Sequence, residues 1–133
     1  MKLEKIIKAQ RQFVKARRWE KFHSPKNIVM ALAGEVGELI ELFQWLTEKQ
    51  SRELRVDKGL KTKVEHEIAD IFFYLCRLSD LLEIDLERAF WTKLEISSRK
   101  YPVKLAKGSA RKYTDLALAL ERGRERKERK LSP

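Results

Sequence analysis

The chain has one cysteine, three prolines and five glycines among its 133 residues. A single cysteine cannot form an intrachain disulfide, so nothing in the sequence indicates an oxidising compartment. Cys76 lies in the apolar run IFFYLC, where we expect a buried and unreactive thiol. Little proline and glycine, together with 38% charged residues, favours helices with solvated faces.

Long hydrophobic runs are also absent. No apolar segment approaches the roughly 18 residues of a membrane span, and the N-terminal MKLEKIIKAQ lacks the apolar core of a signal peptide. We therefore expect a cytoplasmic protein with no membrane partner. With 43% hydrophobic residues, the chain is long enough to form one packed domain.

The net charge of +10 is unevenly distributed along the chain. Residues 99–133 carry 12 Lys/Arg against 4 Asp/Glu, whereas residues 1–98 carry 18 against 16. A basic segment can contact the phosphates of nucleotides or nucleic acid, but its end, ERGRERKERKLSP, is explained more simply as a solvated or disordered terminus. We expect one domain over residues 1–114, followed by a basic C-terminal tail over 115–133 that is partly helical or disordered.

Apolar residues recur at helical spacing, and no stretch alternates as a strand does. Ser24-Pro25 is typical of an N-cap followed by proline in the first helical turn. Asp85 can cap a later helix that Tyr101-Pro102 ends. The polar residues 47–60 are expected to form a connection. The predicted helices cover residues 3–19, 25 to about 45 or 46, 61–82, 86–100 and, as a short fifth element, about 115–120. This pattern predicts an all-α bundle.

Two pairs of carboxylates interrupt the apolar faces of these helices. Glu35 and Glu38 lie in GEVGEL, and Glu67 and Asp70 lie in EHEIADIFFYL. The i, i+3 spacing places the members of each pair on one side of a helix. Helical phasing puts Glu35 inside the apolar stripe and Glu67 beside its stripe, with Glu38 and Asp70 nearer the rim.

An ionised carboxylate on an apolar face is costly without a partner, and residues 27–48 contain no Lys or Arg. Four such acids on two facing helices suit a hard cation such as Mg²⁺. The sequence therefore predicts a metal site formed by Glu35, Glu38, Glu67 and Asp70. An acidic surface facing solvent or another subunit is the alternative.

Gly34 and Gly37 lie beside the first pair of acids. Each costs about 1 kcal/mol relative to alanine inside a helix. We expect them to let another backbone or a phosphate approach closely, and chance tolerance is the alternative.

The E-x-x-E and E-x-x-D pairs resemble the metal signature of the MazG-like, all-α nucleotide pyrophosphohydrolases. Further blocks resemble the dCTP pyrophosphatase subgroup: WEKFHSPKN at 19–27, GEVGELIELFQW at 34–45, EHEIADIFFYL at 65–75, K-x₅-RKYP at 93–102 and SARKYT at 109–114. The likeness covers roughly residues 13–115. It implies a four-helix-bundle-type fold with a basic C-terminal extension. It also implies a homo-oligomer, with a tetramer favoured over a dimer, and pockets that draw residues from two chains.

The resemblance further implies a reaction. A nucleoside triphosphate is hydrolysed to the monophosphate and pyrophosphate with Mg²⁺, for which Mn²⁺ can substitute. The favoured substrate is dCTP or a modified dCTP. The four acids hold the metal, and either Glu35 or Glu38 takes the proton of the attacking water. The positions matched near the base and sugar are Trp19, His23, Asn27, Trp45 and Tyr74, and those near the phosphates are Lys93, Arg99, Tyr101, Arg111, Lys112 and Tyr113.

Ordinary structural roles remain open for several of these residues. Aromatic side chains such as Trp19, Trp45 and Tyr74 more often supply buried area than a platform for a base. His23 can instead form a hydrogen bond within the turn before Ser24.

The sequence departs from the subgroup pattern K-x-D-x-N-R-R-R-Y-P within the fourth helix. Glu95 replaces the Asp, Ser97 the Asn, and Ser98 an Arg. Ser97 offers one short hydroxyl in place of a carboxamide, so the base and sugar preference stays open. A nucleotide-binding relative without turnover is one alternative. Another is a non-enzymatic helical module that binds nucleic acid through its basic C-terminal third. It ranks lower because it gives the acids no role, so we expect no nucleic-acid partner.

Overall fold

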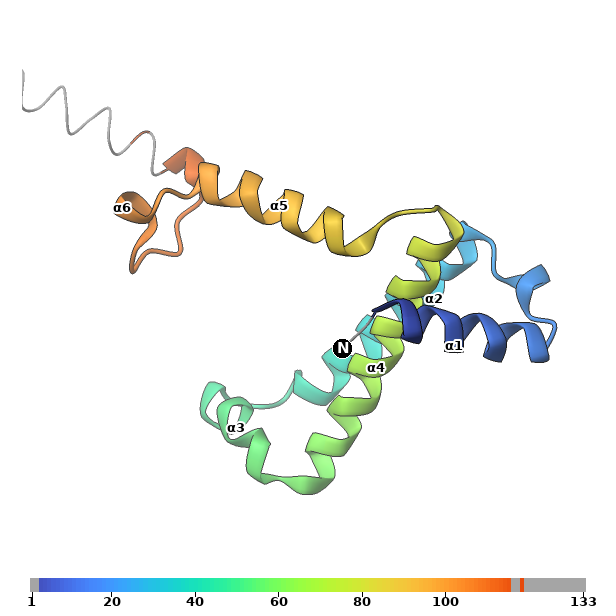
Figure 1. Ribbon diagram of the computed structural model, residues 1–133. Helices are drawn as coiled ribbons and strands as arrows, with labels where there is room; N and C mark the ends of the chain where they lie inside the picture. The colour runs from blue at the N-terminus through green and yellow to red at the C-terminus, as the bar shows by residue number, and fades with distance from the viewer. Residues whose placement is uncertain (1–2, 116–117, 119–133) are drawn as a thin grey trace, which may run out of the picture. The chain divides into compact units, whose positions relative to one another are not determined.

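A computed structural model describes residues 3–115 and 118 of the chain, and every regular element in this part is a helix. The all-helical prediction is confirmed. The elements are α1 (Leu3–Ala16), η1 (Glu20–Phe22), α2 (Pro25–Phe43), α3 (Glu48–Glu53), η2 (Leu54–Val56), α4 (Lys58–Leu81), α5 (Leu86–Lys100) and α6 (Val103–Ala106) (Figure 1). None of the described helices is both long and apolar enough to cross a membrane.

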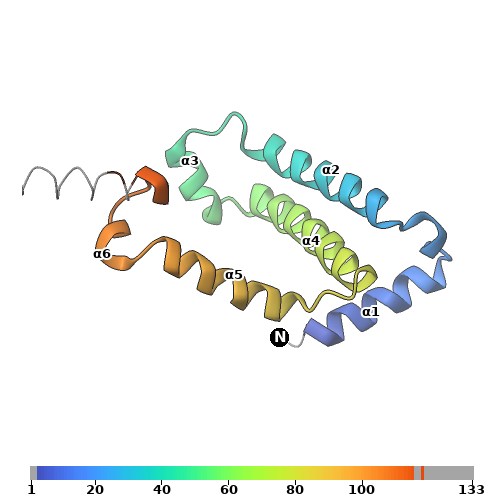
Figure 2. The same ribbon diagram turned by 90° about the horizontal axis from the view of Figure 1, so that it is seen from above.

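The chain divides into two compact units, one ending at Leu86 and the other starting at Glu87. In the first unit α2 packs along α4, and α1 contacts α4 as well (Figure 2). The predicted start of α2 is confirmed, because Ser24 Oγ accepts a hydrogen bond from the Asn27 backbone N–H at 3.3 Å, with Pro25 in the first turn. The predicted domain boundary at residue 114 remains a prediction.

The expected helix over 3–19 is too long, since α1 ends at Ala16. Arg18 has a φ of 54°, a left-handed conformation that a right-handed helix cannot continue through. The backbone turns here before Trp19, which precedes η1.

The connection expected over 47–60 is also corrected, because it contains α3 and η2. Thr47 and Gln50 form a capping box: Thr47 Oγ1 accepts from the Gln50 N–H at 3.3 Å, and Gln50 Oε1 accepts from the Thr47 N–H at 2.9 Å. Asp57 caps α4 by accepting from the Leu60 N–H at 3.0 Å, so α4 starts three residues earlier than expected.

The buried apolar side chains of the first unit are Val14, Ile28, Val64 and Cys76, from α1, α2 and α4. The prediction that Cys76 is buried is confirmed. The apolar stripe predicted for α4 is not all buried.

Its members Ile68, Leu75 and Leu82 are 53%, 38% and 49% exposed. Toward its C-terminal half α4 buries Arg77 and Ser79 instead, because α1 packs there, with Gln10 bonding to the Phe73 carbonyl.

The second unit contains α5 and α6. Helix α5 ends at Lys100, as predicted from Tyr101-Pro102, whereas the short α6 was not predicted. The apolar residues Phe90 and Leu94 of α5 are 59% and 45% exposed. The predicted short helix around 115–120 and the tail beyond it fall almost entirely outside the described residues.

Candidate metal and nucleotide site

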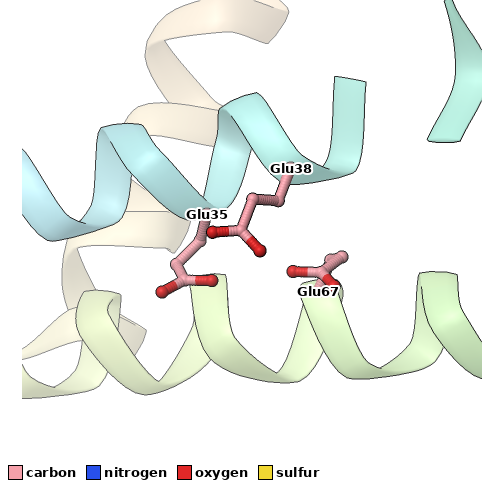
Figure 3. A group of neighbouring side chains, drawn as sticks. All are labelled: Glu35, Glu38 and Glu67. Carbon is pink, nitrogen blue, oxygen red and sulfur yellow. The ribbon is translucent and has the colours of Figure 1, made fainter. Parts of the chain in front are cut away.

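Helices α2 and α4 bring three of the four predicted acids together. Glu35 and Glu38 on α2 and Glu67 on α4 each place one carboxylate oxygen within 4.8 Å of the others. The three side chains point toward one another between the two helices (Figure 3). Glu35 and Glu67 are half-buried and Glu38 is exposed, which is the order of depth that helical phasing predicts.

Asp70 lies one helical turn after Glu67 and is exposed. It belongs to the same electrostatic cluster, because its charge acts on Glu35. Burial raises the pKa of Glu35, and the negative charges of Asp70, Glu38 and Glu67 raise it further. The four predicted acids therefore form one group in which each carboxylate opposes the ionisation of Glu35.

The donor set suits a hard divalent cation. Among residues 3–115, no ion pair involves any of the four acids, so these like charges have no protein counterion. Carboxylate oxygens on two facing helices are the ligands that Mg²⁺ and Mn²⁺ prefer. The raised pKa of Glu35 shows the electrostatic cost that a bound cation would remove.

A cavity of about 530 Å³ lies beside this cluster, lined by residues of α1, α4 and Trp19. Asp70 belongs to both the cavity wall and the acid cluster. Tyr74 lines the cavity too, and its pKa is raised by burial and then by the charges of Glu35 and Asp70. The cavity and the acids thus adjoin along one face of α4.

The cavity wall is largely aromatic. Phe13 contacts Trp19 edge to face with ring centroids 5.8 Å apart, and it meets Phe73 in the same way at 6.0 Å. Phe73 in turn contacts Tyr74 at 5.5 Å. A flat nucleobase can stack on rings of this kind. The structure therefore brings the predicted base contacts Trp19 and Tyr74 to one cavity.

Gln10 is a cavity residue that sequence reasoning missed. It is 5% exposed, and its Nε2 donates to the Phe73 carbonyl at 2.6 Å. Its Oε1 is buried without a hydrogen-bond partner. The sequence carries a signal for it, since Gln10 stands midway in the i, i+4 series from Ile6 to Val14 on the apolar face of α1.

Two further predicted contacts lie at the start of α2, with Asn27 in its first turn and His23 in the turn before it. Asn27 Nδ2 donates to the Phe22 carbonyl at 2.9 Å, so this amide holds the turn itself. The His23 ring lies 6.2 Å from that of Trp19, and its Nδ1 accepts from Arg77 Nε at 3.3 Å. Burial lowers the pKa of His23, the positive charge of Arg77 lowers it further, and Glu20 acts in the opposite direction.

Trp45 stands apart from this group. It follows the C-terminal end of α2, is 86% exposed and does not line the cavity. Gly34 and Gly37 also face open space, since a Cβ at either position would meet no atom within 4 Å. The predicted approach of another backbone to these glycines is not found within the described part of the chain.

The residues predicted near the phosphates all belong to the second unit. Tyr101 and Tyr113 contact each other edge to face at 6.1 Å. Arg99 pairs with Glu95 at 2.5 Å, so the acid at this departure from the subgroup pattern is already engaged. Ser98 Oγ donates to the Leu94 carbonyl at 2.9 Å. Lys93, Arg111 and Lys112 are exposed, and their contact with phosphates stays a prediction.

Comparisons with known proteins match the part of the chain that contains these acids. The model of the MazG-like family matches residues 30–116, which include all four acids. Over 114 residues, or 86% of this chain, dCTP pyrophosphatase 1 of Bos taurus is 41% identical, with 68% of that protein covered.

The human dCTP pyrophosphatase 1 is 40% identical over the same share of this chain, with 67% of its own length covered. The crystal structure of a pyrophosphatase from Archaeoglobus fulgidus superposes with a TM-score of 0.71 and 38% identity, covering 77% of this chain and 94% of that one. The chain therefore belongs to the MazG-like family and is a dCTP pyrophosphatase-like hydrolase.

Proposed function

We propose that this protein is an Mg²⁺-dependent nucleoside triphosphate pyrophosphohydrolase that acts on dCTP or a modified dCTP and so removes unwanted nucleotides from the pool. Water adds across the anhydride bond between the α- and β-phosphates, giving the monophosphate and pyrophosphate. The observation that carries this proposal is the cluster of Glu35, Glu38 and Glu67 between two helices, which forms no ion pair with a lysine or arginine of the described residues. The dCTP pyrophosphatase relatives support the choice of substrate.

Glu35, Glu38, Glu67 and Asp70 would hold the metal, with Mn²⁺ as a substitute for Mg²⁺. A bound ion lowers the pKa of water and polarises phosphoryl oxygens. Glu35 or Glu38 accepts the proton that the attacking water loses. These carboxylates suit both tasks because no lysine or arginine in the described part of the chain neutralises them.

The nucleotide has a separate set of contacts. The base occupies the cavity against Trp19 and Tyr74, with His23 and Asn27 beside it. The proposed phosphate contacts are lysine, arginine and tyrosine side chains, which neutralise and bind anionic oxygens. These residues are Lys93, Arg99, Tyr101, Arg111, Lys112 and Tyr113.

Trp45 completes the site from a second subunit. Its side chain lies beyond the end of α2, is 86% exposed and does not line the cavity of its own chain. We assign the protein to a homo-oligomer, with a tetramer favoured, in which Trp45 stacks on a base held by the neighbouring chain.

The direct test incubates the purified protein with each deoxynucleoside triphosphate and Mg²⁺ and separates the products. The expected result is a monophosphate and pyrophosphate, released fastest from dCTP or its modified forms. Absence of pyrophosphate from every nucleotide would sink the proposal. Orthophosphate and a diphosphate as products would place the cleavage at the wrong bond.

The metal site has a matched pair of variants. Glu38→Gln removes one charge from the cluster, and turnover should fall by roughly 100-fold or more, because even the supporting partners of metal ligands are worth 10- to 100-fold. Glu41→Gln makes the same change on the same helix outside the cluster and should leave turnover unchanged. Circular dichroism confirms that both stay helical. Full activity of Glu38→Gln would remove this residue from the site.

A further inference from the structure

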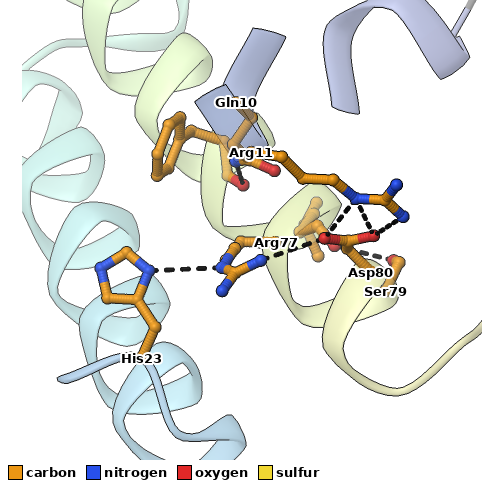
Figure 4. Close-up of polar contacts among 8 residues, drawn as sticks. Gln10, Arg11, His23, Arg77, Ser79 and Asp80 are labelled. Atoms are coloured by element: carbon orange, nitrogen blue, oxygen red, sulfur yellow. Dashed lines mark hydrogen bonds and ion pairs between the residues drawn. The ribbon is translucent and has the colours of Figure 1, made fainter. Parts of the chain in front are cut away.

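Arg77 is an unusual residue for the interior of a small helical unit. Its side chain lies on α4 and is 7% exposed as a whole residue. A buried guanidinium is costly unless its charge is paired. Its Nη1 donates to Asp80 Oδ2 at 3.0 Å, and Arg11 of α1 holds the same carboxylate from the other side. Arg77 is therefore fixed in position by a charged network that joins α1 to α4 (Figure 4).

The remaining Arg77 contact sets the chemical form of His23. Arg77 Nε lies 3.3 Å from His23 Nδ1 with hydrogen-bond geometry. An arginine N–H only donates, so Nδ1 must accept through its lone pair, and the imidazole proton must sit on Nε2. Figure 4 shows the other ring nitrogen on the side away from Arg77.

The surroundings of His23 also oppose a second proton. The ring is partly buried and faces the positive charge of Arg77 on α4, and both lower its pKa. Glu20 in η1 is the one acid that acts on it in the opposite direction, and Trp19 beside it is uncharged. His23 is accordingly neutral near pH 7, with a single N–H donor of fixed direction.

The His23 ring lies beside one residue of the cavity wall. The His23 ring is tilted against Trp19 at 6.2 Å, and Trp19 lines the cavity. We propose that Arg77 is a positioning residue, which holds His23 as a neutral Nε2–H donor for a carbonyl or hydroxyl oxygen of the bound nucleoside. The inference rests on the proposed function for its ligand, but the state of His23 can be measured without one.

Nitrogen NMR of the imidazoles tests whether Arg77 holds His23 as the neutral Nε2–H form. The chain has two histidines, so the signals of His23 can be assigned. We expect His23 to show a protonated Nε2 and an unprotonated Nδ1 at pH 7, with a pKa below the ordinary value of an imidazole. In Arg77→Met the pKa of His23 should rise above its wild-type value, with some Nδ1–H form. Arg77→Lys should restore the wild-type pattern in part, because an ammonium also only donates.

Kinetics with the nucleotide that wild type hydrolyses best test whether His23 donates to the bound nucleoside. Arg77→Met should raise KM by roughly tenfold, the worth of one hydrogen bond, and leave kcat within about twofold because Arg77 touches no reacting group. Arg77→Lys should recover much of the loss. An arginine with only a structural role would change the amount of folded protein, and the KM of the folded protein would not change.

Several outcomes would overturn the inference. One is a wild-type His23 that carries Nδ1–H, or whose pKa is not lowered from the ordinary value of an imidazole. Another is an Arg77→Met protein with an altered His23 and an unchanged KM. If Arg77→Met does not fold, the wild-type spectra and Arg77→Lys decide instead. Failure of every nucleotide to release pyrophosphate would overturn the proposed function and the ligand assigned to His23, whereas the spectra would still decide its tautomer.

Discussion

Glu35 shows how a residue proposed to bind a metal can oppose the stability of its own fold. It lies half-buried on α2, and burial together with three neighbouring carboxylates raises its pKa. The metal-free protein must therefore accommodate a carboxylate whose charged form is disfavoured. Such local costs are common where a site is built for a ligand.

We expect Glu35→Gln to raise the melting temperature of the metal-free protein by about 2 °C or more, because it removes this repulsion. Mg²⁺ should stabilise wild type as any ligand that binds the folded state does, and it should stabilise Glu35→Gln much less. Thermal unfolding with and without millimolar Mg²⁺ measures both effects. Glu41→Gln is the control that keeps the wild-type response. Equal stabilisation of wild type and Glu35→Gln by Mg²⁺ contradicts a role for Glu35 in binding.

The residues hardest to predict are those whose meaning depends on distant partners. The acids of the cluster stand out in sequence because helical phasing exposes a carboxylate on an apolar face. Arg77 carries no comparable local sign of its role, and the place of Gln10 on the apolar face of α1 does not identify its bonding partner. Gln10 bonds to a residue 63 positions away and Arg77 to one 54 positions away, and only the packing of α1 and the turn at His23 against α4 creates these contacts.

At the scale of elements, local chemistry explains both the correct and the incorrect boundaries. The start of α2 follows from Ser24-Pro25, a signal confined to two adjacent residues. Helix α3 has the sequence EKQSRE, with no apolar position to produce a periodic pattern, and its capping box was the one available signal. The end of α1 depends on the left-handed conformation of Arg18, which the presence of an arginine does not predict.

The N-cap of α2 gives a prediction for this scale, because α2 carries Glu35 and Glu38. Ser24→Ala removes the Oγ that accepts from the Asn27 N–H, and it should lower the free energy of unfolding by about 1 kcal/mol. Ser98→Ala is a matched control within α5, where alanine is the better helix former, and stability should be unchanged or slightly higher. Urea unfolding followed by circular dichroism distinguishes the two. An equal loss in both variants would argue against the cap.

At the scale of the whole molecule, the described chain leaves much apolar surface uncovered. Its buried apolar side chains are Val14, Ile28, Val64 and Cys76. On α2, Val29, Val36 and Ile40 are 49%, 39% and 60% exposed, and their spacing of seven and four residues places them on one face of the helix. Contiguous apolar surface of this kind on a small protein marks an interaction site.

In the proposed oligomer, a second copy of the chain covers this apolar face of α2. The mass of the protein in solution is therefore the decisive measurement. Light scattering after size exclusion should give a multiple of 15.8 kDa, with four copies favoured. Ile40→Lys should shift this mass downward, because a desolvated ammonium at the face is costly. Val56→Lys is the control, since Val56 lies in η2 and is already 75% exposed.

The melting temperature should also rise with protein concentration, as it does whenever folding and assembly are coupled. If Trp45 completes a neighbour's site, Ile40→Lys should lose turnover in proportion to its loss of assembled protein, and raising its concentration should recover both together. An active monomer would contradict the assignment of Trp45 to a second subunit. It would leave the acid cluster as the metal site, because Glu35, Glu38 and Glu67 come from one chain.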